Sequence, residues 1–277
     1  MAGYVCTVAG GKGGVGKTTT AVNVAAALEG EGYDVVVVDA DLGMANLAAM
    51  LGVDPDDSIH EILAGGGAVS DALTEAEGGI TIVPGEQSLE AFADADPAKL
   101  KRVVKTLRNA YDVVLIDTGA GLSHETTVPL GLADGILLIT TPDEVAVGDA
   151  VKTAELADRV GGEVLGAMIN RATSETDVET IAEKFDSKLL AVIPDDIAAT
   201  ENEPLVFNSP DSHAAEAYRL LTDQLVGVFF EGERLADVET VVESEWFDDV
   251  DGTTDDESDD DDDDDDGGFA HSVFQGI

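Results

Sequence analysis

The fold of this chain is decided by the stretch Gly11-Lys12-Gly13-Gly14-Val15-Gly16-Lys17-Thr18. An apolar run from Tyr4 to Ala9 precedes it and is typical of a buried strand, and a segment rich in Ala and Val, Thr19 to Leu28, follows it with helical spacing. Strand, glycine loop and helix in this order are the context that the phosphate-binding motif G-x-x-x-x-G-K-[ST] requires. We therefore expect a nucleotide site here, and a purely structural glycine turn is the alternative.

The residue types of this loop fit the chemistry of a bound phosphate. Glycines let backbone N–H groups approach an anion, and the following helix directs its positive dipole end at the same place. We expect Lys17 to contact the outer phosphates and the Thr18 hydroxyl to bind Mg²⁺. The expected nucleotide-binding residues of the loop and its helix are Gly11, Lys12, Gly13, Gly14, Val15, Gly16, Lys17, Thr18 and Thr19.

Lys12 is not required by the general motif and makes the loop more specific. The run from Lys12 to Thr19 resembles the deviant Walker A motif of the MinD/ParA ATPases. This resemblance implies that Lys12 acts catalytically, by reaching across a dimer interface to the partner's nucleotide, and that the ATP-bound form is a homodimer. The alternative for Lys12 is a solvated loop lysine.

A second predicted strand ends at two acids that we expect to lie near the nucleotide site. The continuous β-branched run from Val35 to Val38 is typical of a strand covered on both faces, and it ends at Asp39 and Asp41. Acids at the carboxyl ends of strands lie where α/β sheets bind their ligands. The segment from Asp39 to Leu47 also resembles the first switch of MinD, D-x-D-x-G-x-x-N-L. That resemblance implies that Asp41 orients the attacking water and that Asp39 lies near the outer shell of the metal, whereas helix capping is the alternative for either acid.

A third strand carries a further candidate metal ligand. The hydrophobic run that begins at Asp112 ends at Asp117, which we expect to hold Mg²⁺ as a Walker-B-type acid does. Capping of the next helix is the alternative. The segment from Asp117 to Gly121 resembles the second switch of the family, D-[ST]-P-x-G, with Gly119 where proline is common. We expect this glycine to loosen the loop.

Two later segments are expected to contact the base. By the family resemblance, Asn170 and Arg171 contact adenine, as does a loop that contains Pro194 and Asp195. A side-chain amide can pair with both donor and acceptor edges of adenine. The sequence has no Asn-Lys-x-Asp that would read guanine, so ATP and Mg²⁺ are the expected cofactors. A plain turn residue remains the alternative for Asn170.

The chain as a whole predicts an α/β fold followed by a tail. Alternating apolar strands and helices over residues 1–238 favour a doubly wound, mostly parallel sheet with helices on both faces, as in P-loop NTPases. We expect residues 239–277 to form a disordered acidic tail, because its eight consecutive aspartates, 259–266, repel one another. The apolar C-terminal peptide that starts at Phe269 is either a docking peptide or a frayed terminus.

Charge restricts the partners of this chain. It has 58 Asp+Glu against 14 Lys+Arg, and removing the 17 acids from Glu239 onward still leaves a body of about −27. Such a body is typical of salt-accumulating halophiles and disfavours direct DNA binding. Positive charge is densest at Lys99, Lys101, Arg102, Lys105 and Arg108. That cluster is either a solvated helix face or a docking face for an acidic partner.

These observations leave competing functions. We expect an ATP-hydrolysing dimerisation switch that positions a cellular structure or cell-division component through an unidentified protein partner or cargo. The alternative is a nucleotide-regulated adaptor that recruits partners through its acidic tail, with incidental hydrolysis. An iron–sulfur relative is disfavoured, because Cys6 is the chain's single cysteine. We expect a cytoplasmic protein, or one held at the membrane or a cell pole by a partner, since no basic amphipathic C-terminal helix is present to bind lipid.

Overall fold

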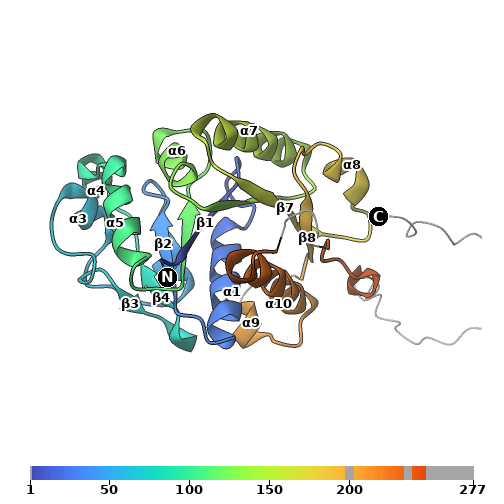
Figure 1. Cartoon of the computed structure of the whole chain (residues 1–277), viewed down its shortest axis with the longest axis horizontal. Coiled ribbons are helices and arrows are strands. Elements are labelled where there is room, and N and C mark those ends of the chain that lie inside the picture. Colours follow the sequence, from blue (N-terminus) through green and yellow to red (C-terminus); the bar gives the residue numbers. More distant parts are fainter. Residues whose placement is uncertain (1, 197–202, 234–238, 248–277) are drawn as a thin grey trace, which may run out of the picture.

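The protein is built on one eight-stranded sheet with strand order β3-β4-β2-β5-β1-β6-β7-β8. The structure is a computed structural model that describes residues 2–196, 203–233 and 239–247. Every strand pairs in parallel with its neighbours except β3, which lies antiparallel to β4 at one edge. Helices cover both faces of the sheet (Figure 1). The predicted α/β, mostly parallel fold is therefore confirmed.

The strands are short and mostly buried on both faces. They are β1 (Tyr4–Ala9), β2 (Val35–Ala40), β3 (Thr74–Glu75), β4 (Thr81–Val83), β5 (Val113–Thr118), β6 (Gly135–Thr140), β7 (Val164–Ala172) and β8 (Leu189–Pro194). Strand β2 shows why the β-branched run is continuous. Its side chains alternate between the two faces, so that Val35 and Val37 join one core and Val36 and Val38 join the other.

The helices alternate with these strands along the chain. They are α1 (Lys17–Gly30), α2 (Leu47–Met50), α3 (Ile59–Ala64), α4 (Leu89–Asp94), α5 (Leu100–Leu107), α6 (His124–Leu130), α7 (Glu144–Val160), α8 (Val178–Ala182), α9 (Leu205–Asn208) and α10 (His213–Val226). Short turns of other helix types are η1 (Glu77–Gly79), η2 (Pro97–Lys99), η3 (Gly227–Glu231) and η5 (Ser244–Phe247). Within the described residues, no helix is long and apolar enough to cross a bilayer.

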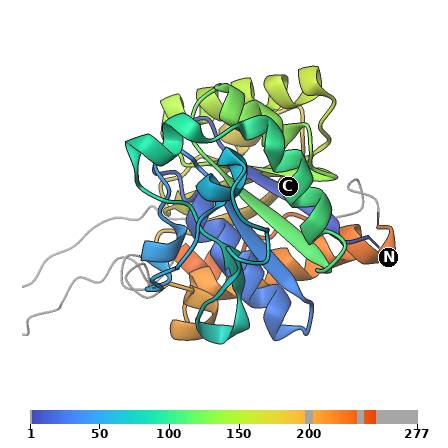
Figure 2. The same ribbon diagram turned by 90° about the vertical axis from the view of Figure 1, so that its left-hand side faces the viewer.

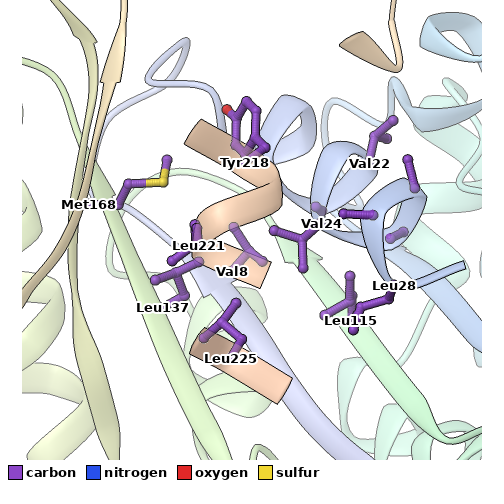
Figure 3. Close-up of a cluster of buried hydrophobic side chains, with 14 of the residues drawn as sticks. Val8, Val22, Val24, Leu28, Leu115, Leu137, Met168, Tyr218, Leu221 and Leu225 are labelled. Atoms are coloured by element: carbon purple, nitrogen blue, oxygen red, sulfur yellow. The ribbon is translucent and has the colours of Figure 1, made fainter. Parts of the chain in front are cut away.

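Two layers of helices enclose the sheet. Helices α1 and α10 pack on one face, where Leu221 and Leu225 lie near Val8 and Leu137 and Leu28 lies beside Leu115 (Figure 3). Helix α1 is buried along most of its length because it lies between the sheet and α10. The other face is covered by α3 and α5 at the β3 end, drawn in teal toward the viewer in Figure 2, and by α6 and α7 further along. The phosphate loop thus starts from the centre of the sheet.

Residues 239–247 belong with this body rather than with the expected tail. The Val241 N–H donates to the Leu190 carbonyl at 2.8 Å, and Val241 bridges to Ala191 of β8. Trp246 is only 3% exposed, and its Nε1–H donates to Glu216 at 3.0 Å. Two large apolar residues therefore anchor this segment in spite of the acids around them. The aspartate run and the apolar C-terminal peptide lie outside the described residues.

Candidate nucleotide site

The glycine loop between β1 and α1 has backbone angles that its glycines make possible. Gly14 and Gly16 have φ values of 77° and 98°, in the left-handed region that L side chains rarely adopt. A Cβ atom on Gly16 would also clash with the side-chain amide of Asn170. The Gly121 N–H of the second switch donates to the Gly11 carbonyl at 3.0 Å. The loop is therefore held in a curved shape from two sides.

Lys17 lies within the curve of this loop, where the motif places the phosphates. Its side chain is buried, and its Nζ donates to the Lys12 carbonyl at 3.3 Å. Burial lowers the pKa of Lys17, while the nearby charges of Asp117 and Asp41 act in the opposite direction. A desolvated ammonium at the start of α1 is well placed to bind an anion.

The two predicted metal ligands of the loop helix and β5 meet directly. The Thr18 hydroxyl donates to Asp117 Oδ2 at 2.6 Å, and Asn46 Oδ1 lies 3.1 Å from the same hydroxyl. Strand pairing places Asp39 opposite Asp117. Burial, and next the charge of Asp39, raise the pKa of Asp117 from 3.8 to about 8. Asp117 Oδ1 is buried without a hydrogen-bond partner.

These residues fit a magnesium ion. A buried carboxylate oxygen with no partner, next to a hydroxyl, offers the oxygen ligands that Mg²⁺ prefers. In the part of the chain that the structure describes, no three His, Cys, Asp or Glu side chains gather into a metal site. Mg²⁺ commonly takes one or two protein ligands and completes its shell with phosphate and water, so Thr18 and Asp117 would be sufficient as its protein ligands.

Asp39 holds the first switch loop by its backbone. The fully buried carboxylate accepts hydrogen bonds from the N–H groups of Asp41, Asn46 and Leu47 at 3.1–3.2 Å. Burial raises the pKa of Asp39 to about 6, although these hydrogen bonds act to lower it. The contacts give Asp39 a structural role in shaping the loop, and its contact with a metal stays a prediction.

Asp41 lies at the tip of β2 against the second switch. Its Oδ1 accepts a hydrogen bond from the Met44 N–H at 3.0 Å. A Cβ atom on Gly119 would lie only 3.0 Å from the same oxygen. Gly119 therefore allows the two switch loops to approach closely at the position where the family commonly has proline.

Two side chains that we did not predict support the first switch from the other side. His60 Nε2 lies 2.9 Å from the Leu42 carbonyl, and its Nδ1 lies 3.1 Å from the Glu86 nitrogen, so the neutral ring donates to Leu42 and accepts from Glu86. The Gln87 side-chain amide donates to the Ala45 carbonyl at 2.6 Å. Nothing local in the sequence points to these contacts, because the partners are 18 to 42 residues apart.

The predicted base-contact residues gather around one cavity beside the loop. It has a volume of about 110 Å³. Its lining includes Thr19, Asn170, Arg171, Pro194, Asp195, Glu203 and Tyr218. Pro194 is the last residue of β8 rather than part of a loop, and Asp195 follows it. Glu203, which the sequence reading missed, accepts a hydrogen bond from Asn23 of α1 at 2.6 Å.

Asn170 has a second role that the sequence did not show. Its Nδ2 donates to the Val15 carbonyl at 3.0 Å, and its Oδ1 accepts from the Arg171 N–H at 3.0 Å. Arg171 itself has a φ of 56°, which is unusual for a residue other than glycine. Asn170 therefore braces the phosphate loop from β7, and its contact with adenine stays a prediction.

Comparison with known proteins agrees with this geometry. A family model described as an AAA domain matches residues 3–161. The uncharacterized ATP-binding protein MJ0547 of Methanocaldococcus jannaschii is 35% identical over 234 residues, which cover 82% of this chain and 89% of that protein. Among solved structures, the septum site-determining protein MinD of Pyrococcus horikoshii, complexed with Mg-ADP, is similar to this chain with a TM-score of 0.78 and 34% sequence identity. The match covers 83% of this chain and 99% of the MinD chain. MinD in the MinC:MinD cell division complex of Aquifex aeolicus has a TM-score of 0.72 and 26% identity, with 81% and 96% of the two chains covered.

Proposed function

Because this chain belongs to the MinD/ParA family of P-loop ATPases, we propose that it is a dimerisation switch, in which two copies close over Mg-ATP and separate after hydrolysis. The observation that carries the proposal is the meeting of Lys17, Thr18, Asp41 and Asp117 at the carboxyl edge of the sheet. This is the set of groups that phosphoryl transfer to water needs, since its catalysis depends on positioning and charge stabilisation.

Each residue of the site has a separate role in binding or hydrolysing the nucleotide. Lys17 neutralises charge on the outer phosphates, and the backbone N–H groups of the glycine loop bind the same oxygens. Thr18 and Asp117 would hold Mg²⁺, which would neutralise part of the phosphate charge. Asp41 orients the attacking water by accepting a hydrogen bond from it. Asp39, His60 and Gln87 keep the first switch, and with it Asp41, in place.

The homodimer is supported by apolar side chains on the face that surrounds the site. Met44, Leu122 and Val145 are 76%, 54% and 61% exposed. They lie just after β2, β5 and β6, so they share the sheet edge from which the phosphate loop starts. Exposed apolar groups gathered around a charged site are typical of a surface that another protein covers. A second copy in this place would bring its own Lys12 toward the nucleotide.

Complementation between two inactive variants tests this proposal. Lys17→Ala should lose ATP binding, whereas Lys12→Ala and Asp41→Ala should each bind ATP but lose hydrolysis. If Lys12 acts across the interface, a mixture of the Lys12→Ala and Asp41→Ala proteins regains part of the activity. In each mixed dimer the site with an intact Asp41 receives the partner's Lys12. A mixture as inactive as either protein alone, or a Lys12→Ala protein that hydrolyses ATP normally, contradicts the proposal.

We further propose that the switch positions a cellular structure or a cell-division component. The proposal is supported by its relatives, which include a septum site-determining protein and the MinD of a MinC:MinD cell division complex. Imaging a tagged protein in cells tests this, with Lys17→Ala as the comparison. The positioned protein should localise to discrete sites and the Lys17→Ala protein should be diffuse. Equal patterns for the two proteins would overturn the positioning role and leave the ATPase proposal standing.

A further inference from the structure

Helix α5 and the turn before it carry a group of cations that lack acidic partners. Arg108 pairs with Asp134 at 3.0 Å. The other four residues, Lys99, Lys101, Arg102 and Lys105, which we call the basic face, form no ion pair with any described residue. Lys12, Lys152 and Arg159 have acidic partners, whereas Arg171, Lys184, Lys188 and Arg219 form no ion pair with a described residue either. The basic face differs from these in that its four cations lie within seven consecutive residues. In a chain with 58 acids, four neighbouring cations without a counterion require an explanation.

A cavity opens beside the basic face. It has a volume of about 410 Å³ and lies between α5 and the glycine turn that follows α3. Its lining combines apolar Ile62, Val69 and Val103 with the cations Lys99 and Arg102. Asp71, an acid beside this turn, already accepts hydrogen bonds from the Ala68 N–H and the Ser70 hydroxyl. No acidic side chain is among the described residues that line the cavity, so Lys99 and Arg102 supply the charge of its lining.

We propose that the chain's own acidic segment, residues 255–266, docks on the basic face. Eleven of its twelve residues are Asp or Glu, so its charge is complementary to that of the four cations. A free acidic partner would first have to approach a protein with a net charge of −44. A tethered segment meets the same repulsion from the body but avoids the translational cost of association, because its effective concentration near the surface is roughly in the millimolar range.

The length of chain after the described residues is sufficient for this contact. Phe247, the last described residue, packs near α8 and follows the bridge to β8, whereas α5 packs over β2 and β5. Strands β2 and β8 are five positions apart in the sheet, which is roughly 24 Å at the usual spacing. Eight residues reach from Phe247 to Asp255 and span about 28 Å when extended. The strand spacing takes up most of that length, and the eleven further residues to Asp266 add about 38 Å when extended, so part of the segment can reach the basic face of its own chain or that of a second copy.

Cysteine cross-linking in the full-length protein tests the docking directly. Cys6 is buried and free, so introduced cysteines can react selectively. One variant combines Ser258→Cys in the acidic segment with Thr106→Cys beside the basic face. Its matched control combines Ser258→Cys with Glu179→Cys on α8, which lies closer to the point where the segment leaves the body. The measurement is the rate of disulfide formation under mild oxidation at low salt.

Docking predicts that the Thr106 pair links several times faster than the Glu179 pair. The advantage should disappear at high salt, because exposed charges are then screened. Lys101→Glu, Arg102→Glu and Lys105→Glu together should abolish it, whereas Lys152→Glu on α7 should not. A Thr106 pair that links no faster than the Glu179 pair, or an advantage that survives charge reversal, overturns the proposal. A basic face that binds an RNA or anionic vesicles while the Thr106 pair fails to link would assign it to that polyanion and also overturn the proposal.

Discussion

Lys12 of the phosphate loop and Asp143 at the start of α7 form an ion pair, with 2.8 Å between Nζ and Oδ1. Asp143 also caps α7, because its side chain accepts a hydrogen bond from the Ala146 N–H at 2.9 Å. The hydrogen bond from Lys12, followed by that from Ala146, holds the pKa of Asp143 below its usual value. Lys12 is thus bound within its own chain, and in the proposed dimer it would have to leave Asp143 before it could reach the partner's nucleotide.

Replacing Asp143 by asparagine should favour dimerisation. Asn remains a good helix cap but removes the charge that holds Lys12. We expect Asp143→Asn to dimerise at a lower protein concentration than the unmodified protein when a non-hydrolysable ATP analogue is present, as measured by analytical ultracentrifugation. Its melting temperature should hardly change, because exposed ion pairs contribute little to stability. Glu155→Gln, which removes the ion pair with Arg159 on the same helix, is the control, and an effect of equal size there would contradict competition for Lys12.

The raised pKa of Asp117 predicts how stability depends on pH in the magnesium-free protein. A carboxyl whose pKa rises from 3.8 to about 8 on folding binds its proton more tightly in the folded state. The resulting stabilisation is complete below the unfolded pKa and is lost as the pH rises toward 8. Asp39, with a pKa of about 6, acts in the same direction. The melting temperature of the protein without nucleotide should therefore fall between about pH 5 and pH 8.

The Asp117→Asn variant isolates the contribution of this residue. Its amide oxygen can still accept the hydrogen bond from Thr18, but it carries no charge. Thermal denaturation should show a higher melting temperature at pH 8 and a flatter pH dependence than in the unmodified protein, together with lost Mg²⁺ dependence of ATP binding. Asp94→Asn on exposed α4 should leave the pH dependence unchanged. An unchanged pH profile in Asp117→Asn would show that this carboxyl is not the source of the effect.

The end of the folded body can be located by truncation. At high salt, where docking of the acidic segment is screened, a chain that stops after Phe247 should be as stable as the full chain, whereas one that stops after Val238 loses the β8 bridge and buried Trp246. Removing a buried Trp side chain costs about 3–5 kcal/mol of unfolding free energy. Urea denaturation followed by circular dichroism should show that difference, and Trp246→Ala should reproduce most of it. Equal midpoints for the two truncated chains would place residues 239–247 outside the cooperative unit.

The sequence predicted those parts of the structure that depend on local pattern. Strand β1 has the predicted bounds, and Asp39 and Asp117 lie at paired positions because each ends an apolar strand. Contacts between distant segments were not predictable, since the partner of His60 or Asn170 has no signature near it in the chain. The segment with Trp246 was misassigned for a different reason: its acidic composition obscured the few apolar residues that anchor it.

The role of Asn170 can be decided by comparing two nucleotides. If its amide only braces the Val15 carbonyl, Asn170→Ala should weaken ATP and GTP binding equally. Loss of one such hydrogen bond inside the site corresponds to a factor on the order of ten in affinity. If the amide also reads adenine, the preference for ATP over GTP should itself decrease. Titration with fluorescent analogues of both nucleotides measures the two affinities and their ratio.

Asp195→Ala is the matched comparison for this test. Asp195 lines the same cavity as Asn170, but its side chain forms no hydrogen bond to the phosphate loop in the described structure. A residue of this kind can change the preference between bases without a common loss of affinity. We expect Asn170→Ala to lower both affinities because the hydrogen bond to Val15 is lost, with a further loss for ATP if the amide also contacts adenine, and Asp195→Ala to change only their ratio. Loss of ATP binding alone in Asn170→Ala would contradict the bracing role, because the loop contacts phosphates that both nucleotides share.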